Sequence, residues 1–298
     1  MKRFLKILLK SFVITLIFLT VFGLIQNKIY QNGSYYKSQW INSINQMSYD
    51  IAFIGNSRGA LHHFDDPEIK YINLSEDGSG LKTTYCQLHL FFKNNNQSKI
   101  IAYDVDLYSL RKINDKKRSP RWIPYFNDPV IYETLKNEHP TFKFHKLLPA
   151  INYATFKYDW NQAALINNLF NLRDSPWGSN GYMCSDTSYI DAVVGGRSDF
   201  DELPPNWYWI DKIHELCKAN NAELKLITSP YFKMLDDIQS NPVFERALSK
   251  RGISYDDYSR LLLGRKEYFR DNRHLNLNGT KKYISIIKNK LINQQLEN

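Results

Sequence analysis

The sequence predicts an α/β protein that is built on a parallel sheet and preceded by one N-terminal transmembrane helix. Short apolar runs alternate with helical patterns through most of the 298 residues. Apolar residues make up 43% of the chain and charged residues 23%, a balance that supports a core and excludes disordered or multi-span membrane classes. A separate uncharged apolar run near the N-terminus predicts the transmembrane helix.

The N-terminal apolar run covers residues 11–25 (SFVITLIFLTVFGLI). Fifteen residues span about 22 Å of a roughly 30 Å hydrocarbon core. Apolar residues among positions 4–9 lengthen the run, because Lys6 and Lys10 can snorkel toward the headgroups. Basic residues are concentrated before the run, and only Lys28 and Lys37 follow it closely. The positive-inside rule therefore predicts a single-pass protein of the cytoplasmic (inner) membrane, with its N-terminus in the cytoplasm and the rest in the periplasm or outside the cell.

Two alternatives to a membrane anchor stay open from the sequence. A basic start before an apolar run is also typical of a cleavable signal peptide. No small-x-small site follows, since the first alanine is Ala52, and the first cysteine, Cys86, is too distant for lipid attachment. The other alternative is a buried helix of a soluble domain. The formal charge of +9 invites a nucleic-acid-binding role, but a location outside the cytoplasm argues against nucleic acid as a partner.

The anchor sets the predicted division of the chain. Residues 1–27 form the cytoplasmic tip and the transmembrane segment, and the polar residues 28–48 form a juxtamembrane stalk. Residues 49–298 form one domain with an insertion at about residues 110–203. Three cysteines are too widely spaced for a disulfide framework or a metal site, so we interpret them as core thiols. They are Cys86, Cys184 and Cys217.

Short apolar, β-prone runs predict the strands, because buried parallel strands are apolar on both faces. The runs lie at residues 50–54, 70–74, 99–105 and 223–228, with a weaker one at residues 252–255. Helical patterns separate or follow them at residues 81–92, 207–219 and 280–291. This alternation predicts a parallel sheet covered by helices.

The insertion interrupts this alternation. It is rich in proline and in basic residues between positions 111 and 121, and it carries Trp122, Trp160 and Trp177. One helix is expected over residues 160–172. The basic residues indicate either a solvated loop or contact with an anionic polymer or lipid headgroups. The tryptophans belong either to a core or to a surface that stacks on sugar rings.

The first candidate for chemistry is the motif FIGNSRG at residues 53–59. An apolar strand ends in Gly55, Asn56 and Ser57, so we expect the Ser57 hydroxyl at a strand-to-helix turn. Backbone N–H groups and the helix dipole favour developing negative charge at such a turn, which suits a nucleophile. Taken alone, a serine after a strand is more often a helix N-cap.

The second candidate is the motif FRDNRHLNLNG at residues 269–279. Asp271 and His274 are three residues apart just before the last helix, so one loop can carry a general base and the carboxylate that orients it. The alternative is a capped helix start with surface charges. His62 and His63 could approach the same site, but no further ligand stands at metal spacing, and no metal site is predicted.

Together, the two motifs resemble those of the SGNH (GDSL-like) hydrolase family, whose first block is G-D-S and whose last is D-x-x-H. The blocks here read Gly55-Asn56-Ser57 and Asp271-Asn272-Arg273-His274. Residues 73–81 (NLSEDGSGL) resemble the family's second block, in which a glycine N–H joins the oxyanion hole, and we choose Gly78 for that role. The resemblance covers about residues 49–291 apart from the insertion, and it implies a three-layer α/β/α, flavodoxin-like sheet.

More narrowly, the chain resembles membrane-anchored SGNH proteins of bacterial cell-envelope and polysaccharide systems. They share an N-terminal span, an I-G-N-S-type block and an H-L-N-x-x-G ending. The resemblance implies a serine esterase or O-acyltransferase that acts on acyl, above all acetyl, esters of envelope or exported glycans. Ser57 is then the nucleophile, His274 the base and Asp271 its orienting carboxylate, while the N–H groups of Ser57 and Gly78 form the oxyanion hole. This chemistry implies no cofactor and no metal.

Two departures from the family pattern keep a second interpretation open. Asn56 replaces the usual aspartate, and the third block, G-x-N-D, is absent, because the chain reads DVDLYS at residues 104–109. An ionised Asp106 cannot donate a hydrogen bond to an oxyanion. These departures favour a non-catalytic SGNH scaffold that binds glycan or assembles an envelope complex.

Overall fold

The computed structural model describes residues 1–44, 46–105, 110, 115, 118–182, 206–233 and 242–292. The chain divides into two compact units. A helical unit comprises Met1–Ile44 and Lys116–Ser175, and a sheet unit comprises Asn45–Asp115 and Pro176–Asn298. Asp106 and Cys184 lie outside the described residues.

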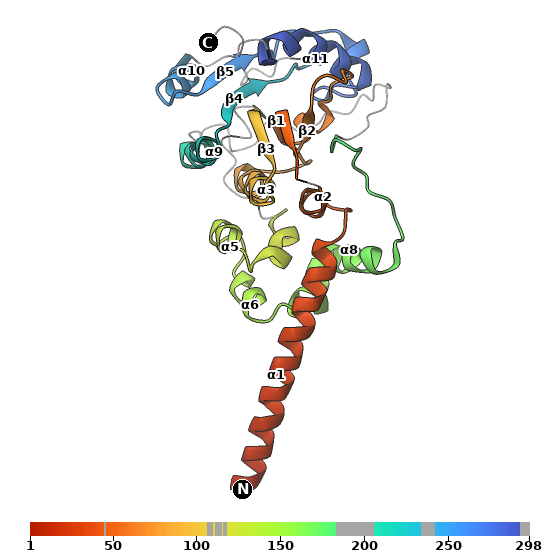
Figure 1. Cartoon of the computed structure of the whole chain (residues 1–298), viewed down its shortest axis with the longest axis vertical. Helices are drawn as coiled ribbons and strands as arrows, with labels where there is room; N and C mark the ends of the chain where they lie inside the picture. Colours follow the sequence, from red (N-terminus) through yellow and green to blue (C-terminus); the bar gives the residue numbers. More distant parts are fainter. Residues whose placement is uncertain are drawn as a thin grey trace. The chain divides into compact units, whose positions relative to one another are not determined.

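Within the described residues, the sheet unit contains five parallel strands in the order β2-β1-β3-β4-β5 (Figure 1). The strands are β1 (Ser48–Gly55), β2 (Tyr71–Asn73), β3 (Gln97–Asp104), β4 (Glu223–Thr228) and β5 (Ser254–Asp257). This is the flavodoxin-like order, in which the chain reverses direction across the sheet between β1 and β3. Ligands of such sheets bind beyond the carboxyl ends of the strands at that switch point, where β1 ends at Gly55 beside Asp104.

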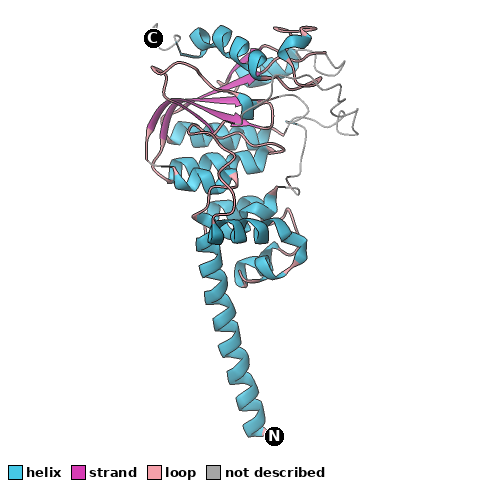
Figure 2. Ribbon diagram, turned by 90° about the vertical axis from the view of Figure 1, so that its right-hand side faces the viewer, coloured by secondary structure: helices cyan, strands magenta, loops and turns pink. Residues whose placement is uncertain are grey.

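Helices cover both faces of this sheet (Figure 2). The described helices of the unit are α3 (Leu81–Lys93), α9 (Trp207–Ala219), α10 (Pro242–Ser249) and α11 (Leu277–Ile292). Alternate residues of β1, Ile51 and Phe53, pack in one core with Tyr283 and Ile287 of α11. Strand β1 is buried from Ile51 to Gly55, as expected for a central parallel strand. The predicted α/β class with a parallel sheet is confirmed.

The helical unit begins with α1 (Lys2–Gln31), which packs against the rest of its unit only near its C-terminal end. Its buried residues are Gly23, Asn27 and Tyr30. The other described elements of the unit are α2 (Lys37–Ser43), η2 (Ser119–Tyr125), α5 (Pro129–Leu135), α6 (Phe142–Leu147), α7 (Ile151–Ala154), η3 (Phe156–Tyr158) and α8 (Asp159–Phe170). The helix expected over residues 160–172 therefore exists as α8.

Aromatic side chains hold the helical unit together. The Tyr30 ring lies 6.2 to 6.4 Å, between centroids, from the rings of Tyr36, Tyr125 and Tyr153. The Tyr30 hydroxyl donates to the backbone carbonyl of Arg121 at 3.1 Å. These contacts join the N-terminal segment to the inserted residues within one compact unit. The domain boundaries predicted at residues 27 and 48 stay a prediction.

Helix α1 is the one described helix that is long and apolar enough to cross a membrane. Only 6% of its most apolar stretch is buried in the protein. A core helix of a soluble domain would be mostly buried, so that alternative is wrong. A membrane anchor and a signal sequence both fit a helix of this kind at the N-terminus.

Candidate active site

The turn that carries Ser57 is built by the end of β1 and by Asn56. Gly55 has φ +145°, and a Cβ there would lie 2.7 Å from the Asp104 carbonyl oxygen of β3, so only glycine fits the position. The Asn56 side-chain oxygen accepts a hydrogen bond from the backbone N–H of Arg58 at 3.0 Å. This Asx turn needs only a side-chain oxygen, which asparagine supplies as well as aspartate. The replacement at position 56 thus preserves the turn.

The expectation that a helix dipole acts at Ser57 is wrong. The turn leads into η1 (Gly59–Leu61), a single 3₁₀ turn, and no α-helix begins there. One short turn does not sum enough peptide dipoles to act as a helix terminus. Side-chain bonds hold the segment instead, since the Asn73 amide at the end of β2 donates to the carbonyls of Gly59 and His62 at 2.7 and 2.9 Å.

Ser57, His274 and Asp271 form one continuous hydrogen-bonded chain. The Ser57 Oγ lies 2.8 Å from His274 Nε2, although 217 positions separate the two residues in sequence. The His274 Nδ1 lies 2.9 and 2.8 Å from the two carboxylate oxygens of Asp271. Because an ionised carboxylate only accepts, we assign the proton to Nδ1, which leaves Nε2 free to accept from the Ser57 hydroxyl.

The loop before α11 holds Asp271 in place. The backbone N–H groups of Arg273 and His274 each donate to Asp271 Oδ1 at 2.8 Å. Burial by itself raises the pKa of Asp271, but the hydrogen bonds from His274 and Arg273 outweigh it and hold the pKa below the ordinary carboxyl value. Asp271 is therefore ionised at neutral pH. The His274 side chain is 17% exposed and that of Asp271 5%, so solvent reaches the histidine more than the carboxylate.

Gly78 lies in the turn after β2, with φ +69°. This is the left-handed conformation that glycine adopts at little cost. The segment before the turn is hydrogen-bonded to β1. The N–H of Leu74 donates to the Phe53 carbonyl at 2.8 Å, and the N–H of Glu76 donates to the Gly55 carbonyl at 3.2 Å. Among the described residues, the N–H groups of Ser57 and Gly78 make no hydrogen bond. Both donors are free, and their role at an oxyanion stays a prediction.

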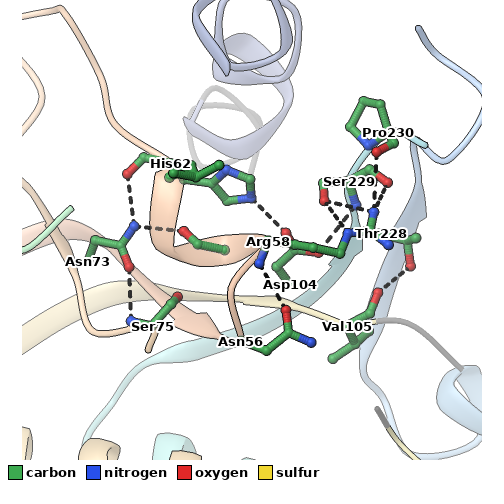
Figure 3. Close-up of polar contacts among 12 residues, drawn as sticks. Asn56, Arg58, His62, Asn73, Ser75, Asp104, Val105, Thr228, Ser229 and Pro230 are labelled. Atoms are coloured by element: carbon green, nitrogen blue, oxygen red, sulfur yellow. Dashed lines mark hydrogen bonds and ion pairs between the residues drawn. The ribbon is translucent and has the colours of Figure 1, made fainter. Parts of the chain in front are cut away.

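A second group of polar residues lies beside the Ser57 turn (Figure 3). Of its members, sequence reasoning named only His62 as a residue near the site. His62 Nε2 lies 2.8 Å from Asp104 Oδ2, and the two side chains are 0% and 1% exposed. Arg58, also buried, donates from Nε and Nη2 to the Ser229 hydroxyl at 3.1 and 2.9 Å. Its guanidinium carbon lies 3.6 Å from the centroid of the Tyr231 ring. The signal was available, because Asp104 ends an apolar strand and Arg58 directly follows the candidate nucleophile.

Asp104 is ionised in this buried group at the end of β3. Burial raises the pKa of Asp104, but the hydrogen bond from His62 and the nearby Arg58 guanidinium outweigh it and hold the pKa below its ordinary value. The third strand ends at Asp104, one residue earlier than predicted, and this carboxylate rather than Asp106 is the one described at its end. His63 points elsewhere and stacks on Tyr182, with ring centroids 4.8 Å apart.

No family model matches the chain, and no curated protein sequence matches it. Among solved structures, the chain is similar to a crystal structure from Bacteroides fragilis that is described as a "putative acylhydrolase". The TM-score is 0.37 and the sequence identity 12%, over 84% of this chain and 88% of that one. A likeness at this TM-score carries no argument about function, so the geometry of Ser57, His274 and Asp271 has to stand by itself.

Proposed function

We propose that this chain is a membrane-anchored serine esterase or O-acyltransferase that acts on acyl, above all acetyl, esters of envelope or exported glycans outside the cytoplasm. The single observation that carries the proposal is the hydrogen-bonded chain from Ser57 through His274 to Asp271. A serine, a histidine and a carboxylate in this order are the parts that acyl transfer through a covalent intermediate requires.

In the first step, the Ser57 Oγ attacks the ester carbonyl while His274 Nε2 takes the hydroxyl proton. Asp271 stabilises the imidazolium that forms and stays ionised, as its lowered pKa allows. The tetrahedral intermediate then collapses, its bond to the alcohol oxygen breaks, and His274 returns the proton to that oxygen. An acyl group is left on Ser57 and a free glycan hydroxyl departs.

In the second step, water or another hydroxyl attacks the acyl-serine, and His274 takes its proton as the base. The bond from the acyl carbon to Ser57 Oγ then breaks, and His274 returns the proton to Ser57 Oγ. Water gives hydrolysis, and a sugar hydroxyl gives transfer. The unpaired N–H groups of Ser57 and Gly78 are our candidates for the oxyanion hole in both steps. The glycan substrate and the location rest on the resemblance to envelope SGNH proteins and on the apolar, exposed α1.

A fluorophosphonate probe tests the chemistry directly, because it labels only an activated serine. We expect one adduct, on Ser57, and no labelling of Ser57→Ala or His274→Ala. Ser285→Ala is the matched control, since Ser285 is an exposed serine on α11 that only donates to the Lys282 carbonyl. A folded chain that takes no label would support the non-catalytic scaffold instead.

Two further measurements test the finer parts of the proposal. Carbonate washing of membranes should leave the full chain, with its N-terminus, in the pellet, whereas a soluble chain that begins near residues 26–35 would show signal cleavage.

Product analysis with an acetylated oligosaccharide and a second sugar acceptor separates free acetate from transferred acetate. Glycan esters that turn over no faster than a simple aryl ester would contradict the glycan assignment.

A further inference from the structure

Helix α6 presents large apolar side chains to the outside of the helical unit. Phe144 is 62% exposed and Leu147 is 70% exposed, while Phe142 and His145 on the other side of the helix are buried. Lys143 and Lys146 lie beside the two apolar residues and are also exposed. A short helix with bulky apolar residues flanked by lysines is typical of segments that lie in a lipid interface.

Contact with α1 sets the depth of this helix. A Cβ at Gly23 of α1 would overlap the backbone nitrogen of Ala150 and would lie 2.9 Å from Pro149 Cβ. The backbone that follows α6 is thus in close contact with Gly23. Leu24 and Ile25, the next residues of α1, are 41% and 53% exposed and end its apolar surface.

The length of α1 places Gly23 at the edge of the hydrocarbon core. The exposed apolar surface runs from Phe4 to Ile25, and these 22 residues of helix span roughly 31 to 33 Å, against a hydrocarbon core of about 30 Å. If α1 spans the bilayer, Gly23 lies within one turn of the outer boundary. Pro149 and Ala150 then lie at the boundary as well, and α6 lies in the headgroup region.

We infer that α6 is an interfacial helix, whose Phe144 and Leu147 insert into the outer leaflet of the same membrane that α1 spans. This inference rests on the membrane anchoring included in the proposed function. Lys143 reaches from the same helix to the lipid phosphates, while the Lys146 ammonium lies 3.8 Å from the centroid of the Tyr132 ring. The helical unit is thereby attached at two points, which restrains its tilt and rotation above the bilayer.

Helix α8, which carries other exposed apolar residues of the helical unit, contacts α1 beyond the end of its apolar surface. Asn168 of α8 donates to the carbonyl of Tyr30 at 3.0 Å, and Tyr30 follows Ile25 by five residues, or about 7.5 Å along the helix. The inference is therefore confined to α6. A position further out still, Asp174, is exposed, and its neighbour Ser175 donates to the Ser34 carbonyl beyond the end of α1 at 3.1 Å.

Site-specific fluorescence on the full chain tests this inference. Phe144→Cys, Leu147→Cys and the control Asp174→Cys are each made in a Cys184→Ser background and labelled with nitrobenzoxadiazole, since Cys86 and Cys217 are buried. The proteins are reconstituted in vesicles of phosphatidylethanolamine and phosphatidylglycerol. We expect iodide in the water to quench the labels at positions 144 and 147 several-fold less than the label at position 174. Spin-labelled lipids should quench them more.

Equal iodide quenching at all three positions, in vesicles that retain the chain after carbonate washing, would overturn the inference and leave the anchor intact. Loss of the chain from the vesicles on washing would overturn the anchor and the inference together. Protection at positions 144 and 147 in native membranes but not in pure lipid vesicles would assign the α6 surface to a protein partner, and would also overturn it.

Discussion

Two histidine–aspartate pairs of the sheet unit have the same 2.8 Å contact and opposite surroundings. His274 and Asp271 stand in the loop before α11, and the second ring nitrogen of His274 meets Ser57. His62 and Asp104 are sealed in the core, where the rings of Phe53 and Tyr283 lie 5.2 and 5.3 Å from the His62 ring. Among the described residues, the second ring nitrogen of His62 has no hydrogen-bond partner.

The difference shows that the pair itself does not define an active site. What defines it is the atom that the free histidine nitrogen faces and whether solvent can bring a substrate there. His274 faces a hydroxyl from a partly exposed position, whereas His62 faces apolar rings from a buried one. The first pair is arranged for proton transfer, and the second stabilises the Ser57 turn through a buried charge.

The largest expected effect comes from the residues that exchange the proton. Ser57→Ala and His274→Ala should each lower kcat for a model ester by roughly 10⁶-fold, because either change removes the nucleophile–base unit. Ser57→Ala should change the unfolding midpoint little, since it removes one partly exposed hydrogen bond. His274→Ala also removes the contact with Asp271 and should lower the midpoint more. Steady-state kinetics with thermal denaturation of the same samples measure both quantities. Wild-type turnover in Ser57→Ala would rule out the mechanism.

Asp271→Ala should lower kcat by about 10⁴-fold, less than either of the previous changes, because the serine and the base remain while the histidine loses its tautomer and orientation. Residual labelling by the fluorophosphonate probe should therefore persist over long incubation. A variant as inactive as Ser57→Ala, and equally unlabelled, would show that Asp271 does more than orient His274.

Asp104→Asn tests the sealed pair, and here we expect a loss of stability. Removing the buried carboxylate leaves the nearby Arg58 guanidinium uncompensated, and a loss of this kind typically costs about 3 to 5 kcal/mol in the free energy of unfolding. Arg58 and His62 would keep their places in the core without the carboxylate. Urea denaturation at neutral pH measures the change. A variant that unfolds like the parent but has lost turnover would move Asp104 from the structural role to the chemistry.

The pH dependence of the same variant provides its control. The pKa of Asp104 lies below its ordinary value in the folded chain, so the unfolded chain binds this proton first as the pH falls. The stabilisation is present in full above the ordinary carboxyl pKa and is lost as the pH falls through the lower, folded value. The difference in the free energy of unfolding between the parent and Asp104→Asn should therefore narrow only at a pH below the ordinary carboxyl pKa.

Gly78→Val is expected to have the smallest effect on kcat among the four variants of the proposed catalytic and oxyanion residues. The positive φ at Gly78 disfavours a β-branched residue, so the N–H should shift away from the reacting oxygen. Losing one oxyanion donor typically costs about 10²- to 10³-fold in kcat. Probe labelling of Ser57 should remain, and circular dichroism checks the fold. A folded variant with unchanged kcat would remove Gly78 from the site.

Local pattern determined the elements of the sheet unit well. The strand predicted at residues 223–228 and the helix predicted at residues 207–219 match β4 and α9 at both ends. Asp271 and His274 were also within reach of a local argument, because three residues separate them and one loop holds both. Apolar runs and short-range spacing depend on neighbouring residues alone, so a sequence records them directly.

Only the tertiary structure decided which of these residues meet. Ser57 and His274 are distant in sequence, and the loop after β1 and the loop before α11 bring Ser57 Oγ and His274 Nε2 to 2.8 Å. Strand order likewise set Asp104 beside Gly55 and buried it with His62, where local pattern predicted neither the partner nor the burial. The turn after Ser57 stayed a single 3₁₀ turn because Asn73, from the neighbouring strand β2, holds its carbonyls. Contacts of this kind depend on chain crossovers and on burial, which no short stretch of sequence encodes.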